Sequence, residues 1–72
     1  MNAELIQRAS SEEVRGLAKW GHADKTPVDL LAAIQEEAGE VAHAINHDEG
    51  REKARQEITQ VVGLYSRLYE MV

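Results

Sequence analysis

The stretch "TPVDLLAAIQEEAGEVAHAINHDEG", residues 26–50, contains the start, body and end of one predicted helix. Thr26 can cap the helix, Pro27 suits its first position, and Asp29 complements the positive end of the helix dipole. The body carries apolar side chains at helical spacing, namely Leu30, Leu31, Ile34, Ala38, Val41 and Ile45. The turn-forming tract "NHDEG" then ends it. We therefore expect a helix from about Pro27 to His47.

Two further helices are predicted on either side of this one. The C-terminal helix starts near Arg51 and carries an apolar stripe made of Ala54, Ile58, Val61, Leu64, Tyr65, Leu68 and Val72. Because the joint between these two helices is short, they should pack antiparallel. The N-terminal helix runs from about Asn2 to Trp20. Within it "SSEE" has the pattern of a capping box, with Ser10 as N-cap and Glu13 three residues later, so one long helix and two shorter ones both stay open.

The whole chain of 72 residues is expected to form one domain, residues 1–72, of the all-α class. Its architecture would be a three-helix unit that contains an antiparallel helical hairpin. A chain this short builds a small core, and it has no cysteine for a disulfide or a thiolate metal site. We therefore expect association into a homodimer or homotetramer that completes a larger helix bundle.

Charge and hydropathy exclude several classes of protein. The net charge is -5, and scattered basic residues argue against a nucleic-acid partner, because phosphate contacts need clustered lysines and arginines. No apolar run is long enough to cross a membrane. The opening "MNAELIQRAS" lacks the apolar core of a signal peptide. The expectation is a cytoplasmic protein with no membrane partner.

Three carboxylates are the candidate functional groups. Glu57 lies inside the apolar stripe of the C-terminal helix, where an unpaired carboxylate is unfavourable. Glu37 and Glu40 are three residues apart, so they share one side of the preceding helix. Antiparallel packing would bring the three together, and protonation or a divalent cation would relieve their repulsion. Oxygen-only ligands suit Mg²⁺ or Mn²⁺, so the pattern favours phosphate-ester or phosphoanhydride chemistry.

Each glutamate also has a simpler interpretation. A helix rich in glutamate usually presents a solvated face, and Glu36, which falls farther toward solvent, fits that description best. Glu57 would be satisfied by pairing with a lysine or arginine, such as Arg15 or Arg67 of another subunit.

The tracts "LLAAIQEEAGEVAHAI" and "ARQEITQVVGLYSRL" together resemble the MazG-type, all-α nucleoside triphosphate pyrophosphohydrolases. The signature of that family is Glu-x-x-Glu on one helix and Glu-x-x-Asp on the next, with a short connector between them. Glu37 and Glu40 match the first half, and Glu57 matches the glutamate of the second. The tract "KWGH", residues 19–22, also resembles the end of the family's first helix.

The resemblance implies a Mg²⁺-dependent enzyme that cleaves a nucleoside triphosphate between its α- and β-phosphates and releases a monophosphate and pyrophosphate. Glu37, Glu40 and Glu57 would hold the metal, which could also be Mn²⁺. Gln60 stands at the fourth ligand position. Glu36 or Glu37 would orient or deprotonate the attacking water.

Few residues are candidates for contacting the nucleotide substrate that the resemblance implies. Lys53 and Arg51 are candidates for binding phosphate, and Trp20 is a candidate for stacking on a base. Solvated charges and a core or interface tryptophan are the simpler interpretations of the same residues.

Two features depart from the family pattern. Gln60 replaces the family's aspartate with a neutral oxygen, and one fewer charge should weaken ion binding. The chain ends at Val72, where family members commonly carry a further C-terminal helix. The alternative is therefore a non-catalytic protein of the same fold that binds nucleotide or assembles.

A rival metal site can be drawn on the helix from Pro27. Glu36, Glu40, His43 and His47 fall within about 60° of one another around the helix axis. Glu40-x-x-His43 is the local pattern of carboxylate-bridged di-iron bundles, which would imply iron or manganese. This stripe lies on the polar side of the helix, which favours a solvated face instead.

Overall fold

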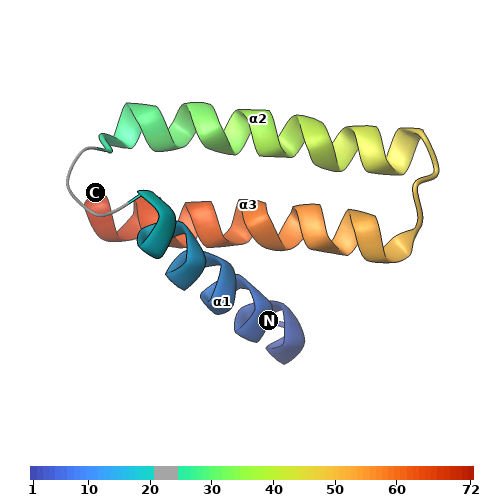
Figure 1. Cartoon of the computed structure of the whole chain (residues 1–72), viewed down its shortest axis with the longest axis horizontal. Helices are drawn as coiled ribbons and strands as arrows, with labels where there is room; N and C mark the ends of the chain where they lie inside the picture. Colours follow the sequence, from blue (N-terminus) through green and yellow to red (C-terminus); the bar gives the residue numbers. More distant parts are fainter. Residues whose placement is uncertain (21–24) are drawn as a thin grey trace.

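Three helices make up the computed structural model, which describes residues 1–20 and 25–72, without the side chains of residues 17–20. They are α1 (Ala3–Trp20), α2 (Pro27–Asn46) and α3 (Arg51–Met71). Figure 1 shows α2 and α3 side by side and antiparallel, with α1 crossing α3 obliquely. The described ranges contain no strand, so the predicted all-α class is confirmed.

The start of α2 is fixed by the capping residues that the sequence indicated. The Asp29 N–H donates to Thr26 Oγ1 at 3.2 Å, and the Thr26 N–H donates to Asp29 Oδ2 at 3.0 Å. These two hydrogen bonds satisfy N–H groups that a helix start leaves without partners. The bonds to the Thr26 backbone and side chain also lower the pKa of the Asp29 carboxyl.

The turn between α2 and α3 uses residues that tolerate left-handed backbone. Asp48 has φ 52° and Gly50 has φ 99°. Gly50 meets no steric penalty there, and Asp48 belongs to the residue types that enter this region most readily. The chain therefore reverses within a few residues and sets α3 antiparallel to α2.

The N-terminal segment forms one continuous helix, α1. The Ser10 hydroxyl donates to the Ile6 carbonyl at 2.9 Å, four residues back, instead of capping a new helix start. The Glu13 carboxylate accepts a hydrogen bond from Ser66 on α3 at 3.1 Å. Of the two alternatives left open, the structure has the single continuous helix, and Ser10 and Glu13 form no capping box because both side chains are engaged elsewhere.

The described core is small and centres on α3, which packs against both α1 and α2. Its buried apolar residues, among those described, are Ala9, Leu30, Ile34 and Ala44. Gly63 brings α1 close, since a Cβ at that position would lie 3.2 Å from the Ala9 carbonyl oxygen. Among the described residues, the backbones of α1 and α2 do not approach each other closely.

The predicted apolar stripes are buried only in part. Tyr65 is 52% exposed and Ile45 is 60% exposed, and Leu31, Ile58 and Val72 are exposed as well. The residues of α3 that are buried are Glu57, Thr59, Gly63 and Arg67. The reason is that α3 is covered on two sides, by α1 and by α2, while a third side carries Ile58 and Tyr65 into solvent.

No helix in the described part of the chain combines the length and the apolar character that a membrane span requires.

Candidate functional site

The candidate site lies between α2 and α3, where the carboxylates of Glu37 and Glu57 meet. Glu57 is 5% exposed and Glu37 is half-buried. Burial is the largest cause of the raised pKa of Glu37, followed by its side-chain hydrogen bond to Glu57 and by the charge of Glu57. The negative charges of Glu40 and Glu36 raise the pKa of Glu37 further. The neighbouring carboxylate of Glu57 thus disfavours the charged form of Glu37, as repulsion between like charges requires.

Gln60 joins the two carboxylates. With its amide nitrogen facing them, Nε2 lies 2.7 Å from Glu37 Oε2 and 3.3 Å from Glu57 Oε2. The reverse orientation would place the amide oxygen against carboxylate oxygens, with no proton between them. Gln60 therefore acts as a donor here, whereas the family pattern led us to expect an oxygen ligand at this position.

Lys53 supplies the positive charge that balances Glu57. Its Nζ lies 2.9 Å from Glu57 Oε1, one helical turn away on α3. The hydrogen bond to Glu57 is the largest cause of the raised pKa of the Lys53 ammonium. The inward placement of Glu57 is thus satisfied within its own helix, by a lysine.

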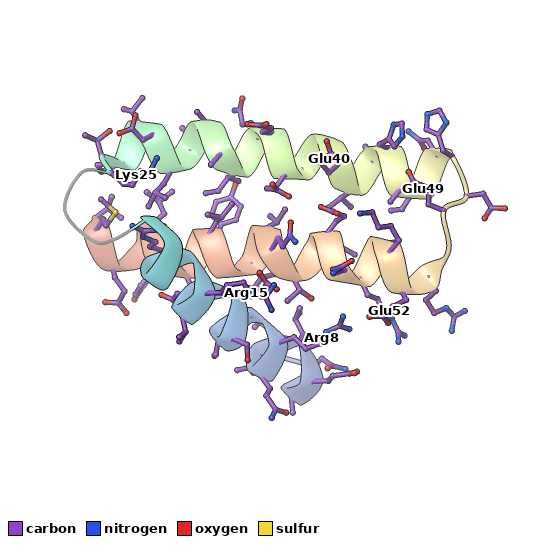
Figure 2. All side chains as sticks on the ribbon, in the orientation of Figure 1. Arg8, Arg15, Lys25, Glu40, Glu49 and Glu52 are labelled. Atoms are coloured by element: carbon purple, nitrogen blue, oxygen red, sulfur yellow. The ribbon has the colours of Figure 1, made fainter. Side chains whose placement is uncertain are left out.

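Glu40 and Glu36 lie at the edge of this site. Both are exposed, and Figure 2 shows Glu40 on α2. The charge of Glu40 raises the pKa of both Glu37 and Lys53, so it acts on the site electrostatically. Of the predicted metal ligands, the structure brings together Glu37, Glu57 and Gln60, and it leaves Glu40 beside them.

The side chains of the site only partly suit a divalent cation. Within residues 1–20 and 25–72, no group of three or more histidine, cysteine, aspartate or glutamate side chains is placed to hold a metal ion. The carboxylates themselves are the ligands that Mg²⁺ prefers. In the described arrangement, however, Gln60 and Lys53 point N–H groups at Glu37 and Glu57. A cation therefore has to displace these donors.

Of the predicted substrate contacts, Lys53 lies in this centre, Arg51 lies at the start of α3, and the side chain of Trp20 falls outside the described residues. Arg51 is exposed at the start of α3, and Lys53 is held by Glu57. The side chain of Trp20 and the end of the tract "KWGH" lie outside the described residues.

The rival histidine site is occupied by contacts within the protein. His43 Nε2 lies 3.3 Å from Glu49 Oε2. The rings of His43 and His47 stack with centroids 4.1 Å apart. Both histidines are exposed, so this cluster matches a solvated helix face.

A pocket of about 340 Å³ opens beside the carboxylate pair and is lined by residues of all three helices. Its lining residues are Glu12, Glu13, Arg15, Gly16, Glu37, Gln60, Gly63, Leu64 and Arg67. From the sequence, Arg15 and Arg67 are candidate partners of Glu57 in another subunit, and no motif places them in a pocket. Predicting the pocket would require knowing how α1 packs on α3. The one hint in the sequence is Gly63, whose small size lets α1 pack closely against α3.

No family model, no curated protein and no solved structure matches this chain.

Proposed function

We propose that the chain is a divalent-cation-dependent nucleotide pyrophosphohydrolase of the MazG type, acting on nucleoside triphosphates at the Glu37–Glu57 pair. The observation that carries the proposal is that pair itself: two repelling carboxylates from facing helices, one of them with a raised pKa, beside a pocket. The resemblance of the surrounding sequence to the MazG-type enzymes supports the choice of reaction.

We assign each glutamate of the site a role in this reaction. Glu37 and Glu57 would hold Mg²⁺ or Mn²⁺, with Glu40 one turn from Glu37 as the third carboxylate. When bound, the cation would supply charge neutralisation at the phosphate oxygens. Glu36 or Glu37 would accept the proton of the attacking water, and Glu37 is the one that lines the pocket.

The test is a panel of nucleoside triphosphates with Mg²⁺ or Mn²⁺, scored by release of pyrophosphate. Glu57→Gln should lower the rate by about 100-fold, because loss of a carboxylate at a metal site weakens both binding and activity. Glu70→Gln is the matched control, since Glu70 is an exposed glutamate on the same helix. Equal rates in the wild type and Glu57→Gln would reject the site.

A second candidate function is a non-catalytic protein that binds nucleotide or assembles. The observation that favours it is that Gln60 and Lys53 already satisfy Glu37 and Glu57 without a metal. Under this alternative the wild type binds nucleotide but releases no pyrophosphate under any metal condition.

Self-association completes the proposal. The apolar residues Leu31, Ala38 and Ile45 recur every seven positions on α2 and are exposed. A second row of exposed apolar residues with the same seven-residue spacing runs along α3 and ends one residue after it: Ile58, Tyr65 and Val72. Helical geometry puts both rows on one side of the hairpin, away from α1, and such rows are the usual seam between helices. A second copy covering this face would give a homodimer, and two dimers a homotetramer.

The substrate class also implies a location. Nucleoside triphosphates are consumed in the cytoplasm, and the proposal places the protein there.

A further inference from the structure

A second pocket, which we call the polar pocket, opens between α1 and α3, and neither Glu37 nor Glu57 lines it. Its volume is about 370 Å³. Every described residue that lines it has a polar side chain: Gln7, Arg8, Ser11, Glu12, Arg15, Gln56 and Thr59. Sites for drug-like molecules usually combine a mostly apolar lining with a few polar groups. The polar pocket therefore suits a small hydrophilic ligand that is held by hydrogen bonds and charge.

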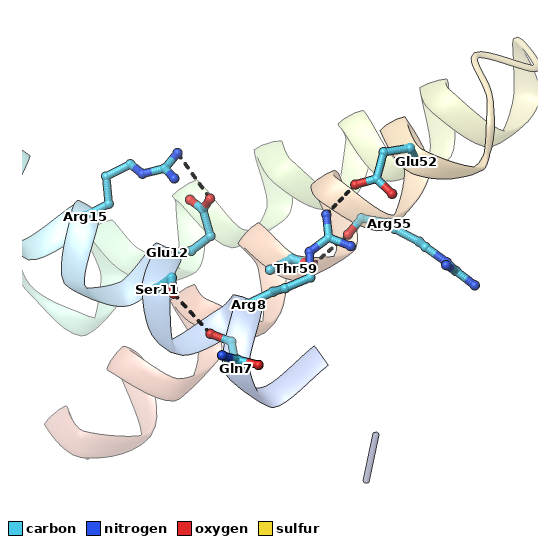
Figure 3. A network of polar contacts seen from close by, with 8 residues as sticks. All are labelled: Gln7, Arg8, Ser11, Glu12, Arg15, Glu52, Arg55 and Thr59. Carbon is cyan, nitrogen blue, oxygen red and sulfur yellow. Dashed lines mark hydrogen bonds and ion pairs between the residues drawn. The ribbon is translucent and has the colours of Figure 1, made fainter. Parts of the chain in front are cut away.

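The α1 side of the polar pocket is one flank of that helix (Figure 3). Gln7, Ser11 and Arg15 follow one another at four-residue spacing, so they form a row along the helix. Arg8 and Glu12 form a second row beside it. The two arginine positions are about 10.5 Å apart along the helix axis, a distance that two long side chains can bridge to reach one ligand.

Each arginine of the polar pocket is paired with a glutamate through one terminal nitrogen. Arg8 Nη2 lies 2.6 Å from Glu52 Oε1, and the Glu52 side chain is 76% exposed. Arg15 Nη1 lies 3.2 Å from Glu12 Oε1, and the Arg15 side chain is 70% exposed. Ion pairs that water reaches contribute little, so the anionic group of a ligand can replace these partners. A guanidinium also has five N–H donors, more than one glutamate contact uses.

The two hydroxyl groups of the polar pocket offer acceptors rather than donors. The Ser11 hydroxyl donates to the Gln7 carbonyl at 3.2 Å, and the Thr59 hydroxyl donates to the Arg55 carbonyl at 2.7 Å (Figure 3). A hydroxyl group has a single proton, so each oxygen has lone pairs left for a ligand. The pocket thus combines charged donors on the arginines with acceptors on the hydroxyls, and it asks for a ligand that carries both an anion and hydroxyl groups.

We propose that the polar pocket binds a small hydroxylated oxyanion, of the class formed by sugar phosphates and sugar acids. Arg8 and Arg15 bind its phosphate or carboxylate, because guanidinium donors match the oxygens of these groups in pairs. The hydroxyls of the ligand donate to Ser11 and Thr59. Binding requires no metal ion and neither carboxylate of the Glu37–Glu57 pair, so it is independent of the proposed function.

The experiment is calorimetric titration of the full chain, at constant ionic strength and without divalent ions. The probes are glucose 6-phosphate, gluconate, glucose and inorganic phosphate. Glucose 6-phosphate or gluconate should bind more tightly than glucose, which lacks the charge, and more tightly than inorganic phosphate, which lacks the sugar hydroxyls. The tighter of the two identifies the anionic group as phosphate or carboxylate. A wild type that binds neither would overturn the proposal.

Arg15→Gln should weaken binding of the tighter probe about tenfold, the effect of losing one charge-assisted hydrogen-bonding group. Arg55→Gln is the matched control, since Arg55 is an exposed arginine on α3 that does not line the polar pocket, and it should stay within about twofold of the wild type. Glu52→Gln removes the present partner of Arg8 and should tighten binding. Equal weakening by Arg15→Gln and Arg55→Gln would mean that only overall charge matters, and it would overturn the site.

Ser11→Ala tests the hydroxyl contact, and Ser10→Ala is its matched control, since Ser10 is an exposed serine on α1 that does not line the polar pocket. Ser11→Ala should weaken binding of the sugar-containing probe about threefold and leave binding of inorganic phosphate unchanged, whereas Ser10→Ala should affect neither. A Ser11→Ala variant that binds the sugar-containing probe as the wild type does would contradict the hydroxyl contacts.

Discussion

Gln60 Nε2 lies 2.7 Å from Glu37 Oε2, so a neutral amide on α3 donates to a carboxylate on α2. The same nitrogen lies 3.3 Å from Glu57 Oε2. A carboxylate at this position would accept rather than donate, and it would add a third negative charge to the junction. The identity of residue 60 therefore decides whether the site is self-sufficient or requires a cation.

Gln60→Asp should convert the junction into a stronger cation site. Without a divalent ion, the added charge should lower the free energy of unfolding by about 1–3 kcal/mol, because a half-buried donor is replaced by a like charge. With Mg²⁺ the stability should return, and pyrophosphate release should exceed that of the wild type. Urea unfolding with and without Mg²⁺ measures the first effect, and the nucleotide assay measures the second.

Gln56→Asp is the matched control for this change, since Gln56 is an exposed glutamine one turn earlier on α3. It should change neither the stability nor its dependence on Mg²⁺ appreciably. If Gln60→Asp behaves like Gln56→Asp, then residue 60 has no part in ion binding.

The raised pKa of Glu37 makes stability depend on pH. A folded state that raises the pKa of a carboxyl binds its proton more tightly than the unfolded state does. The resulting stabilisation is fully present below the ordinary value of 4.5 and is lost as pH rises through the higher folded pKa. The pKa of Asp29 is lowered in the folded state, so Asp29 changes the stability only at pH values below its ordinary pKa of 3.8. Between pH 4.5 and 7 we therefore expect stability to fall as pH rises.

Glu37→Gln should remove most of that slope and make the protein more stable than the wild type at pH 7. The measurement is the urea midpoint at several pH values across this range. Glu70→Gln, at an exposed position, should keep the wild-type slope. A slope unchanged by Glu37→Gln would show that other groups carry the pH dependence.

Gly63 sets the distance between α1 and α3. A Cβ at this position would lie 3.2 Å from the Ala9 carbonyl oxygen, so Gly63→Ala should push α1 away and lower the free energy of unfolding by about 1–3 kcal/mol. Gly39 is the control, because a Cβ there meets nothing within 4 Å. Gly39→Ala should stabilise the protein by about 0.5–1 kcal/mol through its higher helix propensity. Thermal unfolding of the two variants should therefore shift in opposite directions.

The exposed apolar rows of the hairpin predict self-association. Ile58→Glu places a charge in the proposed seam and should yield a smaller species than the wild type in light scattering coupled to size exclusion. Val14→Glu puts the same charge on α1, where Val14 is exposed and outside the seam, and should leave the size unchanged. A wild type that is monomeric at all concentrations would contradict the seam.

The local features of the fold were predictable because they depend on neighbouring residues. Thr26 and Asp29 set the start of α2 by themselves, and Gly50 marks the turn. Ser10 was harder, since its pattern suits either a cap or a helix interior. Its hydroxyl bonds back to the Ile6 carbonyl, and α1 continues through it.

The buried face of α3 could not be predicted from the local sequence pattern alone. Apolar periodicity indicates that Tyr65 should face a core, but it does not say which helix covers it. The docking of α1 against Gly63 and Thr59 instead uses a small and polar side of α3, and Tyr65 stays exposed. For the site, the meeting of Glu37 and Glu57 followed from antiparallel packing, whereas the pairing of Glu57 with Lys53 and the amide orientation of Gln60 required the structure.

Within the described ranges the backbones of α1 and α2 stay apart, and this has a consequence for how the protein opens. Because α3 touches both other helices, α1 can detach while the α2–α3 hairpin stays intact. Amide hydrogen exchange should therefore be fastest in α1 and slowest in α3. Each detachment takes Arg15 and Glu12 away from the pocket, so the pocket would exist in proportion to the docked fraction of α1, and a ligand bound in it would slow exchange along that helix.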